Sequence, residues 1–190
     1  MYSYDTRAEA PRPIIDLIRD DSFWQKLKTL DDIIEPIHEM QLMSESNKST
    51  LDQVYTRWIK LDAHLQSESL ASPFADDLRG YLQRQKSGWG ERMGKQLFPI
   101  HILANILQPS NRRNWQSMVG QLKTQVTDLL DQYGGENLQI EFFDYVDQSN
   151  AFSAANNCWA KTSTHLFWKL MVRKRLLTKM RLIVFPSALS

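Results

Sequence analysis

The apolar positions along the chain recur mainly at helical spacing. The most apolar window near the middle of the chain runs from Leu97 to Pro109. A helix can begin at Pro99, whose missing N–H would be unpaired there anyway, and it must end before Pro109, because the residue before a proline avoids the α region. This segment is apolar nearly all round, and such a helix is normally buried. We therefore expect it to be the central packing element, with longer amphipathic helices on both sides.

Two amphipathic helices are predicted before this centre. The first starts at a cap on Ser22 and runs to about Met43, and Pro36 inside it is expected to cause a kink. The second starts after a short polar connection, with Thr50 or Ser49 as its cap, so the two are expected to pack as an antiparallel hairpin. Their apolar stripes are Phe23, Leu27, Leu30, Ile34 and Ile37 in the first, and Leu51, Val54, Trp58, Leu61 and Leu65 in the second.

Further helices are predicted around the central element. Ser72-Pro73 opens one, as a cap followed by proline at the first helical position. A long helix follows Asn111 or Asn114 and ends at Gly134-Gly135, where glycine can adopt the left-handed cap conformation. A short helix over 136–146 comes next.

The last part of the chain gives weaker signals. Residues 149–163 have the composition of a loop, and residues 164–184 are predicted to form a last helix. Its end, 182–186, is rich in β-prone residues, so a short strand there is an open alternative. The whole pattern predicts an all-α fold, an antiparallel bundle of about six or seven helices with at most one short strand near the C-terminus. It divides into a flexible lead-in at 1–21, a helical domain at 22–147 and a final region at 148–190.

Composition adds limits to this picture. With 190 residues, 42% apolar and 24% charged, the chain resembles an ordinary globular protein that can bury a core. A single cysteine excludes an internal disulfide and a cysteine-based zinc site. No apolar run approaches the length that spans a bilayer, and the first residues do not have the pattern of a signal peptide.

Charge is distributed unevenly along the chain. The net charge is +1, yet residues 148–190 contain seven Lys and Arg and no Asp or Glu, while the first 147 residues contain 16 basic and 22 acidic groups. Two interpretations follow, and both stay open: the two regions attract each other, or the basic region meets an anionic partner.

Motifs for catalysis are weak. Gly88-Trp89-Gly90 lacks the third glycine of a phosphate loop, and the four histidines are far apart in sequence. Acidic groups such as Asp31, Asp32 and Glu35, or Asp128 and Asp131, are more typical of solvated helix faces than of a metal site. Cys158 has no nearby histidine to activate it. The residues by themselves support no enzyme.

One basic stretch is compatible with nucleic acid. Between Arg79 and Arg113 there are seven Lys and Arg, and Glu91 is the only acid. Tyr81, Trp89 and Trp115 alternate with these cations, and exposed aromatic rings can stack on unpaired bases. A basic helix surface over core aromatics would give the same pattern, so both interpretations are kept.

Five spaced segments stand out along the chain: Phe23-Trp24 with Glu35-Pro36-Ile37, residues 48–58, residues 97–109, the spaced aromatics Tyr145, Phe152, Trp159 and Phe167-Trp168, and residues 181–187. In this order they resemble segments of the transposases of the hAT superfamily, and the resemblance covers roughly residues 22–190. The central stretch is similar to that family's "hPiHilAyiLdP" element, with Gln108 where Asp or Asn is usual.

The resemblance implies a ribonuclease-H-like transposase that is interrupted by a helical insertion and cuts DNA with a divalent metal held by three carboxylates. Residues 22–147 would correspond to the insertion, and 148–190 to the start of the dimerisation region. The three metal ligands of the family match no residue of this sequence, so we expect no nuclease activity from this chain, no bound metal and no cofactor. The resemblance also implies a nuclear location; without it a cytoplasmic one is expected.

The resemblance suggests two contact surfaces and two kinds of partner, DNA and a second copy. No membrane or small-molecule partner is expected. The alternative is a helical protein-interaction module with no nucleic-acid role. The predicted DNA-contact residues are Arg84, Trp89, Arg92, Arg112 and Arg113, and the predicted dimer or interdomain residues are Phe167, Trp168 and Leu170.

Overall fold

The computed structural model describes residues 12–46, 49–84, 86–155 and 166–167, and this part of the chain is helical without any strand. The all-α prediction is confirmed there, with eight α-helices instead of six or seven. The elements are α1 (Arg12–Arg19), α2 (Asp21–Glu45), α3 (Leu51–Ala71), α4 (Ala75–Gln83), α5 (Trp89–Gln96), α6 (Pro99–Ile106), α7 (Asn114–Ser117), α8 (Gly120–Asp147) and the 3-10 helix η1 (Asn150–Ala155).

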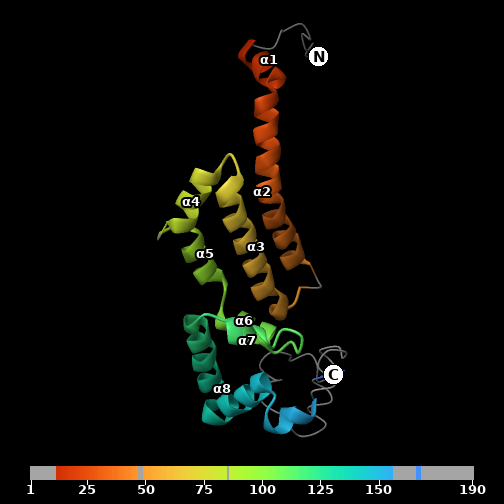
Figure 1. Cartoon of the computed structure of the whole chain (residues 1–190), viewed down its shortest axis with the longest axis vertical. Coiled ribbons are helices and arrows are strands. Elements are labelled where there is room, and N and C mark those ends of the chain that lie inside the picture. The colour runs from red at the N-terminus through yellow and green to blue at the C-terminus, as the bar shows by residue number, and fades with distance from the viewer. Residues whose placement is uncertain (1–11, 47–48, 85, 156–165, 168–190) are drawn as a thin grey trace, which may run out of the picture.

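The helices form an elongated molecule (Figure 1). The helices α2 and α3 run antiparallel as a hairpin, and α4 followed by α5 covers the other side of α3. Helix α6 crosses below the end of this layer, and α8 lies below α6. Helix α1 and the first part of α2 extend beyond all the other helices.

Helix α6 is the centre of the core, as its sequence predicts. Residues 102–107 are all buried, and α6 packs against α3 on one side and α8 on the other. Polar contacts hold it in both directions. The Asn105 side-chain amide donates to the carbonyl oxygen of Asp52 (2.7 Å) and to Thr56 Oγ1 (2.8 Å), while the Tyr145 hydroxyl donates to the carbonyl oxygen of Ile106 (3.1 Å).

The start of α2 differs from the prediction. Asp20, not Ser22, is the N-cap, and its carboxylate accepts the backbone N–H of Ser22 at 2.9 Å. Part of the expected flexible lead-in, residues 12–19, forms α1. Pro36 lies within α2, which is a single helix from end to end. The predicted cap position Thr50 does precede α3.

The long helix predicted after Asn111 or Asn114 is interrupted. Met118 and Val119 are extended and separate α7 from α8, which fits the preference of a β-branched residue for extended backbone. The break predicted at the glycine pair is present within α8, where Gly135 has φ 64° and ψ −159°. The expected loop at 149–163 begins with η1. Of the predicted helix over 164–184, only residues 166–167 lie within the described part of the chain, and both are helical. The alternative strand at 182–186 lies outside it.

Candidate functional site

The turn between α4 and α5 carries most of the predicted basic stretch. Ser87 adopts a left-handed conformation, and Gly88 forms the N-cap of α5. A Cβ atom on Gly88 would come 2.2 Å from the carbonyl oxygen of Arg84, so only glycine fits there. The tight turn brings the end of α4 close to the start of α5.

Glu91, the only acid of that stretch, is already engaged inside the turn. Its carboxylate accepts Lys95 Nζ at 2.6 Å and also the backbone N–H of Ser87. The hydrogen bond from Lys95, followed by that from Ser87, lowers the pKa of Glu91 below its ordinary value. Glu91 and Lys95 therefore neutralise each other, and no second acid of this stretch is left to pair with the neighbouring cations.

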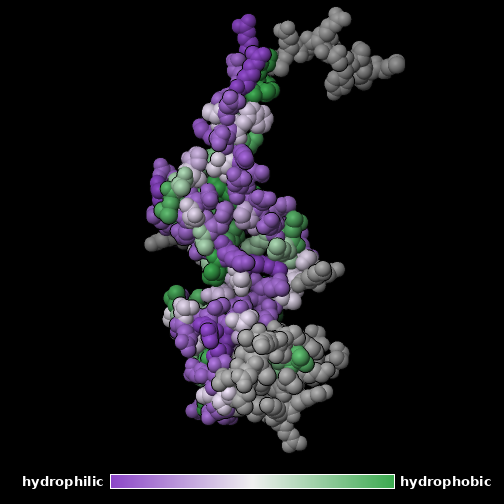
Figure 2. Space-filling model, turned by 45° about the vertical axis from the view of Figure 1, so that its right-hand side comes forward, coloured by the Kyte–Doolittle hydropathy of each residue, from purple (hydrophilic) through white to green (hydrophobic). Residues whose placement is uncertain are grey.

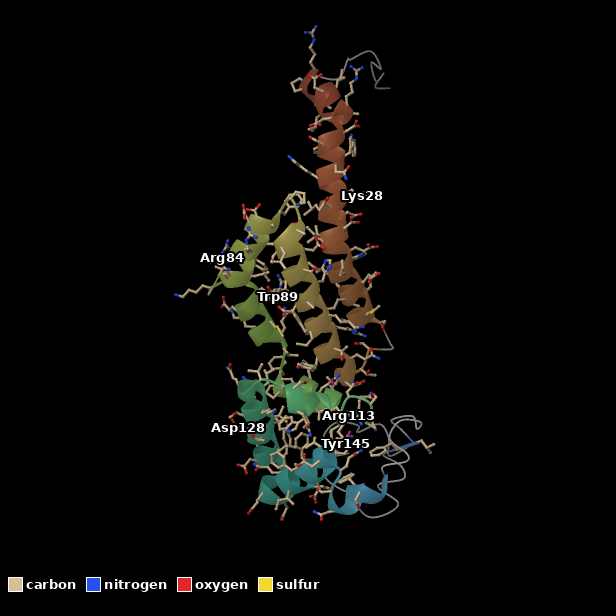
Figure 3. The ribbon with its side chains drawn as sticks, viewed as in Figure 1. Lys28, Arg84, Trp89, Arg113, Asp128 and Tyr145 are labelled. Atoms are coloured by element: carbon tan, nitrogen blue, oxygen red, sulfur yellow. The ribbon has the colours of Figure 1, made fainter. Side chains whose placement is uncertain are left out.

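Three exposed cations remain on this turn: Arg84, Lys86 and Arg92, which we call the α4–α5 basic surface. In the part of the chain that the structure describes, the two ion pairs are Arg79–Asp76 and Lys95–Glu91, so none of the three belongs to one. Arg84 points away from the body of the molecule (Figure 3). A shallow polar hollow lies beside these cations, lined by Tyr81, Ser87, Gly88, Glu91, Arg92, Lys95 and Gln96.

Trp89 is a core residue in the structure, although the sequence suggested a nucleic-acid contact. Only 7% of it is exposed, and its ring lies 5.2 Å from that of Trp58 on α3. Its indole N–H donates to the Asp62 carboxylate at 2.7 Å, and the side chain points inward (Figure 3). The ring therefore has no open face on which a base can stack. Sequence reasoning placed it on the surface because core and surface aromatics look alike in composition.

Arg112 and Arg113 occupy different environments. Arg112 is buried, its Nη1 donates to the carbonyl oxygen of Val146 at 2.8 Å, and this burial lowers its pKa. Arg112 therefore ties the chain before α7 to the end of α8. Arg113 is exposed, but it lies in the lower part of the molecule, away from Arg84 (Figure 3). Of the five predicted DNA-contact residues, the structure brings only Arg84 and Arg92 together on one exposed surface.

The predicted dimer residues are only partly described. Phe167 is buried, and its ring lies 6.3 Å from that of Tyr145, which also contacts Phe152 at 5.4 Å. Phe167 thus packs within its own chain. Trp168 and Leu170 lie outside the described residues.

The histidines have structural contacts. His101 Nδ1 accepts the backbone N–H of Phe98 at the start of α6 (3.2 Å), and burial lowers the pKa of this imidazole. His64 Nε2 lies 3.3 Å from the carbonyl oxygen of Ile33, which links α3 to α2. Among the residues described, no three His, Cys, Asp or Glu side chains come together as a metal site, and no helix is long and apolar enough to cross a membrane.

A surface that sequence reasoning missed follows α2. The apolar face of α2 consists of Trp24, Leu27, Leu30, Ile34 and Ile37, each between 38% and 47% exposed. The sequence pattern predicted a packed stripe of Phe23, Leu27, Leu30, Ile34 and Ile37 in the hairpin, and for the last four of these residues that expectation was wrong. Ile33 is buried and Met40 is partly buried against the core instead, because α2 presents a different side to α3 and extends past it. In the view of Figure 2 the projecting part of the molecule is mostly polar, with a few exposed apolar side chains near its upper end.

Two hollows lie end to end along this face. They share Asp31 and Ile34 as common lining residues. The first is lined by Trp24, Leu27, Lys28, Leu30, Asp31 and Ile34, and the second by Asp31, Ile34, Glu35, Ile37, His38 and Gln41.

The chain was compared with models of protein families, with curated proteins and with solved structures. No model of a protein family matches the chain, and no curated protein or solved structure matches it either. The resemblance to hAT transposases stays a prediction from the sequence.

Proposed function

We propose that this chain is a non-catalytic scaffold of a hAT-like transposase, which binds DNA through the α4–α5 basic surface. The observation that carries the proposal is the group of three exposed cations around one tight turn, Arg84, Lys86 and Arg92, which form no ion pair with any residue that the structure describes. The five transposase-like segments and the helical architecture support it. A nuclear location and self-association belong to the same proposal, which follows from the resemblance.

The kind of binding follows from the residues on the surface. Lys and Arg neutralise phosphates, whereas sequence reading needs side chains that reach base edges. With Trp89 enclosed in the core, stacking on unpaired bases adds nothing at this turn. The proposal is therefore contact with the phosphate backbone, without a strong sequence preference.

The salt dependence of binding to a labelled DNA duplex tests this. For the unmodified chain, the logarithm of the affinity should fall linearly with the logarithm of the salt concentration. The double variant Arg84→Ala/Arg92→Ala should reduce that slope by about two units, since about one unit is lost for each phosphate contact. Fluorescence anisotropy of the labelled duplex measures the affinity at salt concentrations from about 50 to about 200 mM. The slope is obtained from these affinities.

Lys28→Ala is the matched control, because Lys28 is an exposed cation on α2, far from Arg84 (Figure 3). It should leave the slope unchanged. An unchanged slope in the Arg84→Ala/Arg92→Ala variant, or no salt-dependent binding by the unmodified chain, contradicts the proposal.

A second candidate is a helical protein-interaction module with no nucleic-acid role. The exposed apolar face of α2 favours it, because soluble monomeric proteins rarely leave a large contiguous apolar patch uncovered. The same titration separates the two candidates, since a module of this kind shows no salt-dependent binding to DNA.

A further inference from the structure

We propose that Ser87 is a phosphorylation site and that its phosphate regulates DNA binding by the α4–α5 basic surface. The effect on DNA rests on the proposed function, whereas the assignment of the site depends only on the turn between α4 and α5. The modifying partner is a serine kinase with an acidic substrate cleft.

The hydroxyl of Ser87 is accessible in the folded protein. Helix α4 ends at Gln83 and α5 begins at Trp89, so Ser87 lies in the turn between two helices. The residue is exposed. Its backbone N–H donates to Glu91, and its hydroxyl makes no hydrogen bond to any residue that the structure describes. Exposed turns on a rigid scaffold are where an enzyme reaches a folded chain most easily.

Few hydroxyl groups combine such exposure with a cation at a suitable spacing. Kinases with acidic clefts select a serine or threonine by the basic residues that precede it, and the position three residues before is one of those that count. Among the described residues, Ser22, Thr29 and Ser87 follow a Lys or Arg at this spacing. Ser22 and Thr29 lie within α2, and Thr29 Oγ1 donates to the carbonyl oxygen of Gln25 at 3.0 Å. Of the three, Ser87 is the one that lies between helices.

The residues directly before the two serines differ in charge. Ser87 is preceded by Arg84 and Lys86, two cations within three residues. Ser22 follows two aspartates directly, and an acidic cleft repels them. The chain therefore contains its own matched control, a serine with the same spacing from an arginine but with opposite charge beside it.

The modification transfers one phosphoryl group from ATP. Ser87 Oγ attacks the γ-phosphorus and forms a new O–P bond, while the bond from that phosphorus to the oxygen bridging to the β-phosphate breaks. ADP leaves with the electron pair of the broken bond, and the hydroxyl proton passes to the catalytic aspartate of the kinase. The resulting phosphoserine carries a charge of about −1.5 to −2 at pH 7.

This charge would lie within the α4–α5 basic surface. Ser87 lines the polar hollow together with Arg92, and it lies between Arg84 and Arg92 in the chain. Arginine pairs well with phosphate, because its two parallel N–H donors match the phosphate oxygens. Glu91 also lines the hollow, but Lys95 neutralises it. The charge of +3 on the three cations of this surface therefore falls to about +1, which weakens the attraction to a DNA backbone.

A kinase assay on the full, folded chain tests the site. The probe is the catalytic subunit of the cyclic-AMP-dependent protein kinase with ATP and Mg²⁺. Mass spectrometry of peptides should find phosphate at Ser87 and about tenfold less, or lower still, at Ser22, which corresponds to a preference of ~1.4 kcal/mol. Arg84→Ala should lower the initial rate at Ser87 by about tenfold as well. Lys28→Ala, which removes an exposed cation from α2, should leave that rate unchanged.

Ser87→phosphoserine, introduced by genetic code expansion, tests the regulation without the kinase. In the DNA titration this chain should lose about two units of the salt slope, because its phosphate occupies cations that would otherwise contact DNA. Ser22→phosphoserine gives the same net charge and should keep the slope of the unmodified chain. Circular dichroism checks that both chains are folded.

The outcomes separate this inference from the proposed function. Absence of phosphate at Ser87, equal phosphate at Ser22, or a rate at Ser87 that Arg84→Ala does not change would overturn the site. An unchanged slope for Ser87→phosphoserine, in a chain that binds DNA when unmodified, would overturn the regulation. If the unmodified chain shows no salt-dependent binding to DNA, the proposed function fails and the regulation with it, while the kinase assay still decides the site.

Discussion

Single buried polar groups connect the parts of this molecule. The Tyr145 hydroxyl is enclosed in the core and donates to α6, and burial raises the pKa of this phenol, so it stays protonated as a donor. On the same helix, burial and, secondarily, the charge of Asp144 raise the pKa of Glu141 to about 7. Glu141 is half-buried, and its charged form is therefore less stable in the folded protein than in the unfolded chain.

Glu141→Gln should stabilise the protein at pH 8 by about 1 kcal/mol, after allowance for partial solvent screening. The Glu141 carboxyl has a pKa of 4.5 in the unfolded chain and about 7 in the folded protein, so the folded state binds its proton more tightly. The stability of the unmodified chain therefore falls as the pH rises from 4.5 to about 7. Urea unfolding at pH 4, 6 and 8 measures this. The gain should disappear at pH 4, and exposed Glu136→Gln should change nothing. An equal gain at every pH would contradict the assignment.

At the scale of elements, turns with special backbone geometry decide where the long helices change direction. Gly135 divides α8 with a backbone conformation that is essentially restricted to glycine. The extended backbone at Met118 and Val119 separates α7 from α8. These breaks let the end of α8 reach α6, where Tyr145 makes its hydrogen bond.

Gly135→Ala should therefore lower the free energy of unfolding by about 1–3 kcal/mol, because alanine is strained at this φ and ψ even though the space for its Cβ is open. Gly80→Ala in α4 is the control, since Gly80 has helical backbone and open space. It should raise stability by up to about 1 kcal/mol. Thermal unfolding followed by circular dichroism compares them, and a Gly135→Ala variant as stable as the unmodified chain would contradict the reading of this break.

At the scale of the whole molecule, α6 belongs to both parts of the core. It is buried against α3 above and α8 below, and hydrogen bonds from Asn105 and Tyr145 connect it in both directions. A helix shared in this way makes the unfolding of one part expose apolar surface of the other. The two parts are therefore expected to unfold together.

Leu65→Ala on α3 and Leu130→Ala on α8 test this coupling, because both leucines are buried in different parts of the molecule. Each should cost about 2–5 kcal/mol and lower one common unfolding transition. Urea titrations followed by tryptophan fluorescence and by circular dichroism should coincide for both variants. Two separated transitions in either variant would show that the parts unfold independently.

Much of the helical architecture could be predicted from the sequence, because local signals determine it. The proline at the start of α6, the glycine pair within α8 and the spacing of apolar residues act within one or two turns of the chain. The predicted sites depended on exposure, which is not local. Trp89 and Arg112 have the residue types of a DNA contact, and both are buried, whereas Arg84 and Arg92 lie on the surface.

The sequence by itself determined that this protein is helical and which segment is its centre, since these follow from propensity and from an apolar segment that only a core can accommodate. Only the tertiary structure decided which side of each amphipathic helix is covered. The stripe from Leu27 to Ile37 has the pattern of a buried face, yet it stays exposed in the described structure because α2 presents Ile33 to its neighbours and extends past α3. Burial depends on where neighbouring helices begin and end, and that information is spread over the whole chain.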